Sequence, residues 1–414
     1  MPMRIIIAGG GLGGLSLALA LRQSLGRNYE IVLADPALAR SLRADTRAYA
    51  ISAAGRRMFA ALGVWDAMQG GAEPITDMLV TDSKTRDVVR PGYLTFAHPS
   101  AGGDDERAQP FAHMVWSRVI NDVLTGACRA AGVLLRPDTV RAVETGPDAS
   151  VVTYGSGDQH RACLVVAADG ARSRLRESAA IGWVGWDYGQ SGIVATVAHE
   201  RPHGGRAIEH FLPAGPFAVL PLPDDPANGH QSSIVWTEAT GDAETLLSLH
   251  QDDLLGELES RFGLQLGELR FASTPKAYPL SFGIARRFVV ERLALLGDAA
   301  HVIHPIAGQG LNLGLKDAAS LAETIVDAAR LGLDVGLESA LAPYQAARRF
   351  DTVAMGVVTD GLNRLFSNDL TPVRLARDLG LGLVDRMPGL KAMFISEASG
   401  NSSSQPRLLR GEAV

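Results

Sequence analysis

The sequence predicts a mixed α/β fold, with a discontinuous first domain built on a parallel sheet, an inserted β-sheet domain and a helical C-terminal region. Three observations predict it. The chain opens with a short apolar run, a cluster of glycines and a helical pattern in residues 4–21. Residues 183–280 carry strand patterns separated by proline and glycine turns. Residues 292–301 then return to the buried-strand pattern of the opening segment.

The first domain begins with a strand–helix–strand unit. Residues 4–8 form a continuous apolar run typical of a buried parallel strand, and residues 30–35 repeat that pattern. Helical spacing from Leu12 to about Leu25 lies between them, and Gly26 suits a helix end. Further along, the pattern predicts helices and then short strands: helices at 53–69 and 115–131, and strands at 133–135, 139–144, 150–154 and 162–168.

The rest of the chain predicts one helix near 244–262, a helix from Leu311 to Ala329 and a mainly helical stretch at 338–396. Residues 399–414 are rich in Ser, Gly and Arg, so we expect a flexible tail there. The expected domains are the first domain at 1–75, 105–182 and 283–335, the β-sheet domain at 76–104 and 183–282, the helical region at 336–398 and the tail at 399–414.

The composition excludes several classes of protein. The 414 residues carry a net charge of −6, which argues against a nucleic-acid-binding protein. Cys128 and Cys163 form neither a metal-binding spacing nor a disulfide framework, so no metal site is expected. The chain contains no run of about 18 apolar residues and no recognisable secretory signal. These features predict a cytoplasmic protein that touches a membrane peripherally at most.

The glycine cluster predicts a Rossmann-like dinucleotide site. Gly9, Gly11 and Gly14 form a G-x-G-x-x-G pattern between a strand and a helix. The first glycine allows a tight turn, the second lets a pyrophosphate approach the backbone, and the third lets the helix pack closely on the strand. Asp35 ends the second strand 21 residues after Gly14, where its carboxylate can accept bonds from ribose hydroxyls and disfavours a 2′-phosphate. This pattern leaves NAD and FAD as alternatives.

The stretch GDAAHVIHPIAGQGLNLGLKDA, residues 297–318, favours FAD. Asp298 follows a buried strand, at the end where open α/β sheets bind ligands. Gly308 and Gly310 open a new helix, whose N-terminus favours negative charge. A reduced flavin carries its negative charge at the N1/O2 edge of the ring, whereas an NAD enzyme has no need of a second helix N-terminus there.

Taken together, these motifs resemble the three fingerprints of FAD-dependent aromatic hydroxylases: the glycine turn, Asp169-Gly170 in VVAADGARSRLR, and Gly297-Asp298. Within that group the chain is most similar to the ubiquinone-biosynthesis hydroxylases. DTRAYAIS (45–52), LGVWDAM (62–68), PFAVLPLPD (216–224), SSIVWTE (232–238) and TDGLNRLF (359–366) match strings of that family. The resemblance implies a Rossmann-like FAD-binding domain, an inserted β-sheet substrate domain and a helical C-terminal region.

The resemblance also implies roles for individual residues. Asp35 would hold the adenosine ribose, Arg47 and Arg118 would contact FAD, and Asp298 would bind a ribityl hydroxyl. The backbone from Gly308 to Asn312 would face the pyrimidine edge of the flavin, and Pro305 would line the reactive face. The implied cofactor-binding residues are Gly9, Gly11, Gly14, Asp35, Arg47, Arg118, Asp169, Gly297, Asp298, Gly308, Gly310, Leu311 and Asn312.

The activity implied by the resemblance is hydroxylation of a prenylated phenolic ring in ubiquinone biosynthesis. NAD(P)H as co-substrate would reduce FAD, and O2 would react through a flavin C4a-hydroperoxide. His301 and His304 are candidates for assisting deprotonation of the phenol, because a histidine titrates in the right range. A hydrogen-bonded structural role for either histidine is the alternative.

The implied partners are a lipophilic phenolic substrate and O2, with no nucleic acid. Apolar residues spaced along the tail from Leu362 to Phe394 suggest peripheral contact with the inner membrane, other ubiquinone-biosynthesis proteins or a second copy, although internal packing is the alternative. Two other functions remain open at this point: an FAD hydroxylase of a soluble aromatic compound, and a non-catalytic FAD-containing subunit of a biosynthetic complex.

Overall fold

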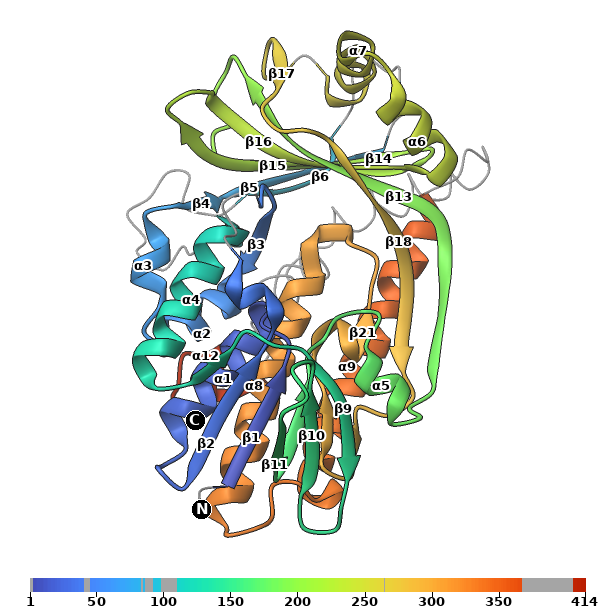
Figure 1. Ribbon diagram of the computed structural model, residues 1–414. Coiled ribbons are helices and arrows are strands. Elements are labelled where there is room, and N and C mark those ends of the chain that lie inside the picture. Colours follow the sequence, from blue (N-terminus) through green and yellow to red (C-terminus); the bar gives the residue numbers. More distant parts are fainter. Residues whose placement is uncertain are drawn as a thin grey trace.

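The computed structural model describes residues 3–40, 45–82, 85, 92–97, 110–263, 265–366 and 405–414 (Figure 1). Its lower part is built on a six-stranded sheet with the order β19-β20-β12-β1-β2-β8. The strands are β1 (Met3–Ala8), β2 (Tyr29–Ala34), β8 (Leu134–Arg136), β12 (Leu164–Ala167), β19 (Val289–Val290) and β20 (Leu293–Leu295). All neighbours pair in parallel except β19 and β20. The parallel arrangement confirms the predicted Rossmann-like sheet.

Three long helices accompany this sheet: α1 (Leu12–Ser24), α4 (Ser117–Ala131) and α8 (Gln309–Arg330). Helix α1 packs against both α4 and α8. Its residues from Gly14 to Leu21 are all buried, which explains an apolar pattern that runs around the whole helix. A small antiparallel sheet of β9 (Val140–Thr145), β10 (Ser150–Tyr154) and β11 (Gln159–Ala162) lies beside it.

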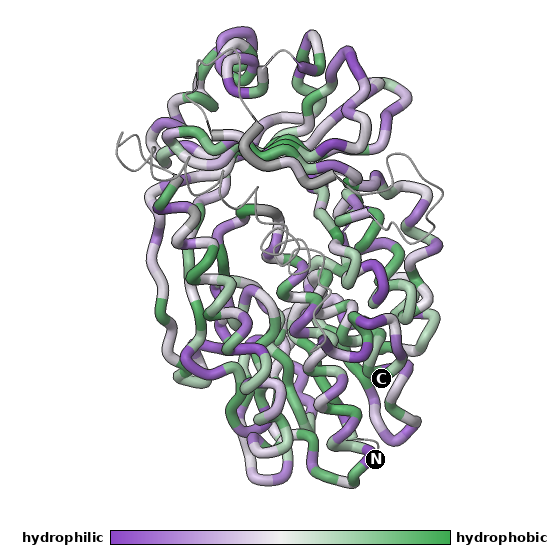
Figure 2. The backbone as a smooth tube through the Cα atoms, turned by 180° about the vertical axis from the view of Figure 1, so that it is seen from behind, coloured by the Kyte–Doolittle hydropathy of each residue, from purple (hydrophilic) through white to green (hydrophobic). Residues whose placement is uncertain are grey.

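A large sheet forms the upper part of the molecule, in the order β21-β18-β13-β16-β15-β14-β5-β6, with β17 paired to β13. Its strands are β5 (Asp77–Asp82), β6 (Gly92–Ala97), β13 (Trp183–His199), β14 (Arg206–Leu212), β15 (Gly215–Asp225), β16 (Gly229–Ala239), β17 (Leu269–Phe271), β18 (Lys276–Ala285) and β21 (His301–Val302). Figure 2 shows apolar residues gathered along its central strands. Phe217, Trp236 and Leu258 belong to a hydrophobic core of its own.

Helices α6 (Thr240–Ser248) and α7 (Gln251–Phe262) lie on the outer side of this sheet (Figure 1). The sequence pattern predicted one helix here; the chain is extended at Leu249 and His250, which separates two helices. Strands β13 and β18 are long enough to run from the large sheet down to the lower part, where Trp183 pairs with Ala285. These two strands join the two parts of the molecule.

The remaining elements lie around the junction. Strands β3 (Ala48–Ser52), β4 (Ala72–Ile75) and β7 (Ala112–Trp116) form a separate three-stranded sheet. The helices are α2 (Ala53–Ala61), α3 (Trp65–Gln69), α5 (Arg174–Ser178) and α9 (Glu338–Phe366), and the short 3-10 helices are η1 (Pro36–Ala39), η2 (Gly297–Ala299) and η3 (Ile306–Gly308). The predicted helix at 53–69 is divided at Gly63, which has φ +72°.

The last ten residues correct one expectation. Residues 405–414 pack on the protein, so the prediction of a flexible tail is wrong for this stretch. Helix α12 (Arg407–Arg410) contacts α2 and α8, and its Leu408 and Leu409 are buried. Arg407 pairs with Glu323 of α8, with Nε 2.8 Å from Oε1. The buried leucines and the ion pair of Arg407 together hold this short helix on the protein.

Residues 367–398 of the predicted helical region and residues 399–404 of the predicted tail lie outside the described residues. The same holds for residues 83–84, 86–91 and 98–104 of the predicted β-sheet domain. Among the helices that the structure describes, none combines the length and the apolar character that a membrane span requires. The exact domain boundaries stay a prediction.

Candidate functional site

The glycine turn after β1 has the geometry that a dinucleotide requires. Gly9 has φ +125°, and a Cβ there would lie 2.0 Å from the carbonyl oxygen of Ala168. A Cβ at Gly14 would lie 2.1 Å from the carbonyl oxygen of Gly9, whereas a Cβ at Gly11 would meet nothing within 4 Å. Gly9 and Gly14 are therefore needed by the fold itself. The space beside Gly11, at the N-terminus of α1, stays open, as the prediction of a pyrophosphate site there requires.

Asp35 lies at the end of β2 beside this turn. Its Oδ2 accepts a hydrogen bond from the backbone N–H of Gly10 (2.6 Å), and its Oδ1 accepts one from the N–H of Ala37 (2.6 Å). The carboxylate is half-exposed, so it retains accessible lone pairs for ribose hydroxyls. The two backbone bonds fix its orientation next to the open space at Gly11.

Gly297 and Asp298 follow β20 on the same edge of the six-stranded sheet. Gly297 has φ +59°, and its N–H donates to Oδ2 of Asp317 (3.1 Å). The side chain of Asp298 is accessible to solvent. Neighbouring protein atoms nevertheless desolvate its carboxyl group in part, and this raises the pKa of Asp298. The loop thus presents an accessible carboxyl group next to the N-terminus of α8.

The N-terminus of α8 is shaped by Gly308, the N-cap, which has φ +63° and no side chain to cap the helix. A Cβ at Gly310 would meet nothing within 4 Å. The side chain of Asn312 accepts from the N–H of Ser52 (3.0 Å) and donates to the carbonyl of Ala50 (3.0 Å). Leu311 packs against the main core. Asn312 therefore anchors the helix to β3, and its backbone is the part that remains for a ligand.

Arg47 and Arg118 lie close to the start of α4. The carbonyl of Arg47 accepts from the N–H of Ser117 (2.9 Å), and Arg118 lies over the ring of Trp116, 4.6 Å from its centroid. Arg47 also pairs with Asp45, whose carboxylate accepts from the Ser117 hydroxyl (2.8 Å). Burial opposes ionisation of Asp45, but these bonds outweigh it and lower its pKa to about 2. No sequence motif had indicated Asp45 as the partner of Arg47.

Asp169 lies at the end of β12, directly beside Gly9. It is exposed, and its Oδ2 accepts from the N–H of Leu175 (3.3 Å). Arg176 follows on α5 and is buried; its guanidinium donates to the carbonyl oxygens of Ala299 (2.9 Å) and Ala171 (3.0 Å). Arg176 thus ties the Asp169 segment to the Gly297–Ala299 segment, so the three motifs meet at one edge of the sheet.

The two candidate histidines have opposite surroundings. His301 is buried, and its Nε2 lies 2.6 Å from Oδ2 of Asp317, whose Oδ1 accepts from Nε of Arg348 (2.6 Å). His304 is buried as well, but neither ring nitrogen has a hydrogen-bond partner among the described residues. Pro305 follows it, half-buried, at the start of η3. The partner of His301 favours the structural alternative for that residue.

Comparison with known proteins identifies the family. A family model described as an FAD binding domain matches residues 3–355. Ubiquinone hydroxylase UbiL of Rhodospirillum rubrum is 44% identical over 412 residues, which cover 98% of this chain and 92% of that protein.

The chain belongs to the FAD-dependent aromatic hydroxylases of the ubiquinone-biosynthesis family.

Further similarities agree. The 3-demethoxyubiquinol 3-hydroxylase of Escherichia coli is 34% identical, with 96% of this chain and 99% of that protein covered. Among solved structures, p-nitrophenol 4-monooxygenase PnpA from Pseudomonas putida superimposes with a TM-score of 0.76 at 18% identity, covering 96% of this chain and 97% of that one. The latter similarity supports the fold. FAD is the cofactor of this hydroxylase, and NAD(P)H is the co-substrate typical of its family.

The residues present fit FAD. The turn at Gly9 and Gly14 excludes side chains, Gly11 leaves open space, and a second helix begins at a left-handed glycine. Asp35 and Asp298 present carboxyl groups at this edge, and such groups accept hydrogen bonds from hydroxyls. The role of each predicted residue stays a prediction.

Asp317, which no sequence motif singled out, is a central residue of this hydroxylase. Its carboxylate is fully buried and accepts from Gly297, His301 and Arg348. Arg348 also pairs with Asp351, with Nη1 2.7 Å from Oδ2. The sequence offered one signal, an aspartate on the otherwise apolar face of a predicted helix, but its partners lie on other segments.

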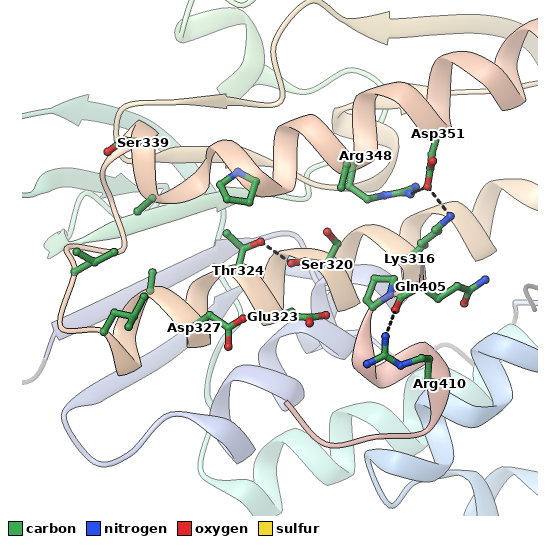
Figure 3. A pocket seen from close by; sticks show the side chains of 17 residues that line it. Lys316, Ser320, Glu323, Thr324, Asp327, Ser339, Arg348, Asp351, Gln405 and Arg410 are labelled. Atoms are coloured by element: carbon green, nitrogen blue, oxygen red, sulfur yellow. Dashed lines mark hydrogen bonds and ion pairs between the residues drawn. The ribbon is translucent and has the colours of Figure 1, made fainter. Parts of the chain in front are cut away.

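A separate cavity of about 580 Å³ lies between α8, α9 and α12 (Figure 3). Lys316, Ser320 and Glu323 of α8 line one side, and Arg348 and Asp351 line another. None of the predicted cofactor-binding residues is among its lining residues. The cavity therefore does not coincide with the predicted FAD site of the hydroxylase.

Gly11→Ala is expected to separate cofactor binding from folding. The backbone at Gly11 has φ −69°, which alanine adopts without strain, and the added Cβ meets no protein atom. We expect the free energy of unfolding of the apoprotein to change by less than about 0.5 kcal/mol, and the affinity for FAD, measured by fluorescence titration, to fall about tenfold or more. Gly14→Ala is the contrast and should destabilise the protein itself. Wild-type FAD affinity in Gly11→Ala would contradict this placement of the pyrophosphate.

Asp317→Asn is expected to lower the free energy of unfolding by about 3–5 kcal/mol at neutral pH, because it removes the buried carboxylate that pairs with Arg348 and accepts from His301. Burial opposes ionisation of Asp317, but these two partners lower its pKa to about 2, below the ordinary 3.8. Its contribution is therefore present above the ordinary pKa and is lost as pH falls toward about 2.

Urea unfolding at neutral pH and at about pH 3 checks this. The difference between the wild type and Asp317→Asn should shrink as pH falls. Asp327→Asn is the matched control, because this aspartate of the same helix is half-exposed and pairs with Arg407 at the surface; it should cost less than about 1 kcal/mol. Equal stability of Asp317→Asn and the wild type at neutral pH is the contrary result.

Proposed function

We propose that this hydroxylase acts on the phenolic ring of a prenylated ubiquinone precursor, with NAD(P)H and O2 as co-substrates. The observation that carries the proposal is the 44% identity to ubiquinone hydroxylase UbiL along 98% of the chain. The 34% identity to the 3-demethoxyubiquinol 3-hydroxylase of Escherichia coli, which spans 96% of the chain, supports the same substrate class.

In this proposal the chain holds FAD in an extended form along the edge of the six-stranded sheet. The backbone at Gly11 binds the pyrophosphate, Asp35 binds the adenosine ribose, and Asp298 binds a ribityl hydroxyl. Arg47 and Arg118 contribute positive charge near the chain of the cofactor. The N-terminus of α8, from Gly308, stabilises negative charge at the flavin edge, because the helix dipole is positive there.

Bound FAD supplies the redox chemistry between NAD(P)H, O2 and the ring. The protein has three tasks: to orient the phenol, to exclude water and to stabilise charge. Pro305 lines the space for the phenol at the junction with the large sheet. The apolar side chains of Phe282, Ile303 and Leu313, which form a small buried cluster at this junction, exclude water.

A deletion strain tests the proposal. Its lipid extract should contain an under-hydroxylated quinone precursor, and the wild-type chain should restore ubiquinone. Asp298→Ala should restore little, because loss of the ribityl contact weakens FAD binding. Asp66→Ala, at an exposed aspartate of α3, is the matched control and should restore ubiquinone fully. Unchanged ubiquinone in the deletion strain would instead point to a soluble aromatic substrate or a non-catalytic role.

We also propose peripheral contact with the inner membrane through α9. Phe350 and Val357 of this helix are 77% and 66% exposed, and Val353 is exposed beside them. Arg349 is exposed next to Phe350, and its positive charge suits anionic lipid headgroups. We expect the protein to sediment with liposomes that contain phosphatidylglycerol, and Phe350→Asp with Val357→Asp to remain in the supernatant. Equal sedimentation of both proteins would favour another occupant of this surface, such as a second copy.

A further inference from the structure

The imidazole of His304 is fully buried, yet neither ring nitrogen has a hydrogen-bond partner among the residues that the structure describes. Native proteins seldom leave a buried polar group unpaired, because its desolvation is then not compensated. His199 shows the ordinary case in the same chain: its Nδ1 lies 2.7 Å from the carbonyl of Arg201 and its Nε2 lies 3.0 Å from the hydroxyl of Ser232. The unpaired imidazole of His304 therefore points to a polar partner other than the residues that the structure describes.

His304 lies where three parts of the molecule meet. It follows β21 and directly precedes Pro305 and η3, which lead into the N-terminus of α8. Its ring packs edge-on against Tyr188 of β13, with 5.1 Å between centroids. Asp360 of α9 is the third neighbour, and its carboxylate acts electrostatically on both side chains. The imidazole thus lies between the proposed flavin end of the FAD site and the large sheet.

The backbone around Tyr188 is shaped to bring its ring to this place. The ladder between β13 and β18 is regular up to the pair Asp187 and Ser281, and resumes at Gln190 and Leu280. Tyr188 and Gly189 fall in the resulting bulge, where Gly189 has φ +65°. Bulges redirect side chains and are frequent next to active sites. Gln190 then accepts a hydrogen bond from Asn363 of α9 (2.9 Å), which holds the bulge against that helix.

The surroundings keep the imidazole neutral. Burial lowers the pKa of His304 to about 4, although Asp360 acts in the opposite direction. Arg364 forms an ion pair with Asp360, with Nε 3.0 Å from Oδ2, and reduces that influence further. A neutral imidazole offers one N–H donor and one nitrogen acceptor. It is too weak a base to remove the proton of a phenol, but it is well suited to accept a hydrogen bond from one.

We propose that His304, supported by Tyr188, binds the phenolic hydroxyl of the substrate through a neutral hydrogen bond and so orients the ring for hydroxylation. This proposal rests on the proposed function, because it takes the substrate to be a phenol. It assigns His304 a binding role without proton abstraction. Tyr188 is a positioning residue that acts through the imidazole.

The test uses the FAD-loaded protein and two probes, a short-chain 2-prenylphenol and its methyl ether, which lacks the hydroxyl donor. Dissociation constants are measured from the change in flavin absorbance on titration. The wild type should bind the phenol about tenfold more tightly than the ether. In His304→Leu this ratio should fall to about one, and His304→Gln, which keeps an acceptor, should restore part of it. The wild-type ratio should stay constant between about pH 6 and pH 8, because the imidazole stays neutral there.

The stability of the ligand-free protein provides a second test, because replacing a structural histidine would lower it. Removing an unpaired buried polar group should leave the midpoint of urea unfolding of the ligand-free protein unchanged or raise it. His199→Leu is the matched control: it removes a paired buried histidine, so it should lower the midpoint while keeping the phenol-to-ether ratio of the wild type.

The outcomes distinguish the two proposals. If the wild type binds and hydroxylates the phenol but His304→Leu keeps the tenfold ratio, the role of His304 is overturned and the proposed function stands. If His304→Leu lowers the unfolding midpoint as His199→Leu does, His304 is a structural residue and the inference fails. If the wild type neither binds nor hydroxylates the phenol, the proposed function fails and the inference falls with it.

Discussion

The carboxylate of Asp317 is the group on which the arrangement of the site depends. It is fully buried in α8 and accepts from the N–H of Gly297, from His301 and from Arg348 of α9. A buried carboxylate tolerates desolvation only when such donors surround it. One side chain thereby fixes the loop that carries Asp298, the strand that precedes His304, and the helix that packs against both. The geometry of the proposed flavin end of the site is therefore tied to a buried ion-pair network centred on Asp317.

The proposed adenosine end of the site is organised in a different way, mainly by the absence of side chains. Gly9 and Gly14 let β1, α1 and the end of β12 approach more closely than any other residue would allow. Asp35 is oriented there by two backbone N–H groups. Arg176, which reaches Ala299 from α5, connects this region to the other end. Buried polar contacts across the edge of the parallel sheet thus fix the position of the two ends relative to each other.

Much of this could be predicted from the sequence, and the rest could not for physical reasons. The parallel sheet and the roles of Gly9, Gly11 and Gly14 follow from local patterns, because what a glycine permits depends on nearby backbone. The contrast between His301 and His304 does not follow, because the two lie three residues apart in one string, and only the fold brings Asp317 of α8 to His301 and leaves His304 without such a partner among the described residues. The docking of residues 405–414 was missed for the same reason: Leu408 and Leu409 are buried by α2 and α8, and a polar composition does not reveal distant contacts.

The order of the segments along the chain has a consequence for biosynthesis of the protein. The six-stranded sheet receives β1 and β2 near the start of the chain and β20 only after the whole of β13 to β18 has been made. On the ribosome, the strands of the large sheet can thus pair with one another while the lower sheet still lacks a member. The edge that presents Asp298 and the N-terminus of α8 is completed only after all of these strands, with α9 and α12 still to follow. The cofactor can therefore bind its complete site only after most of the chain has been made.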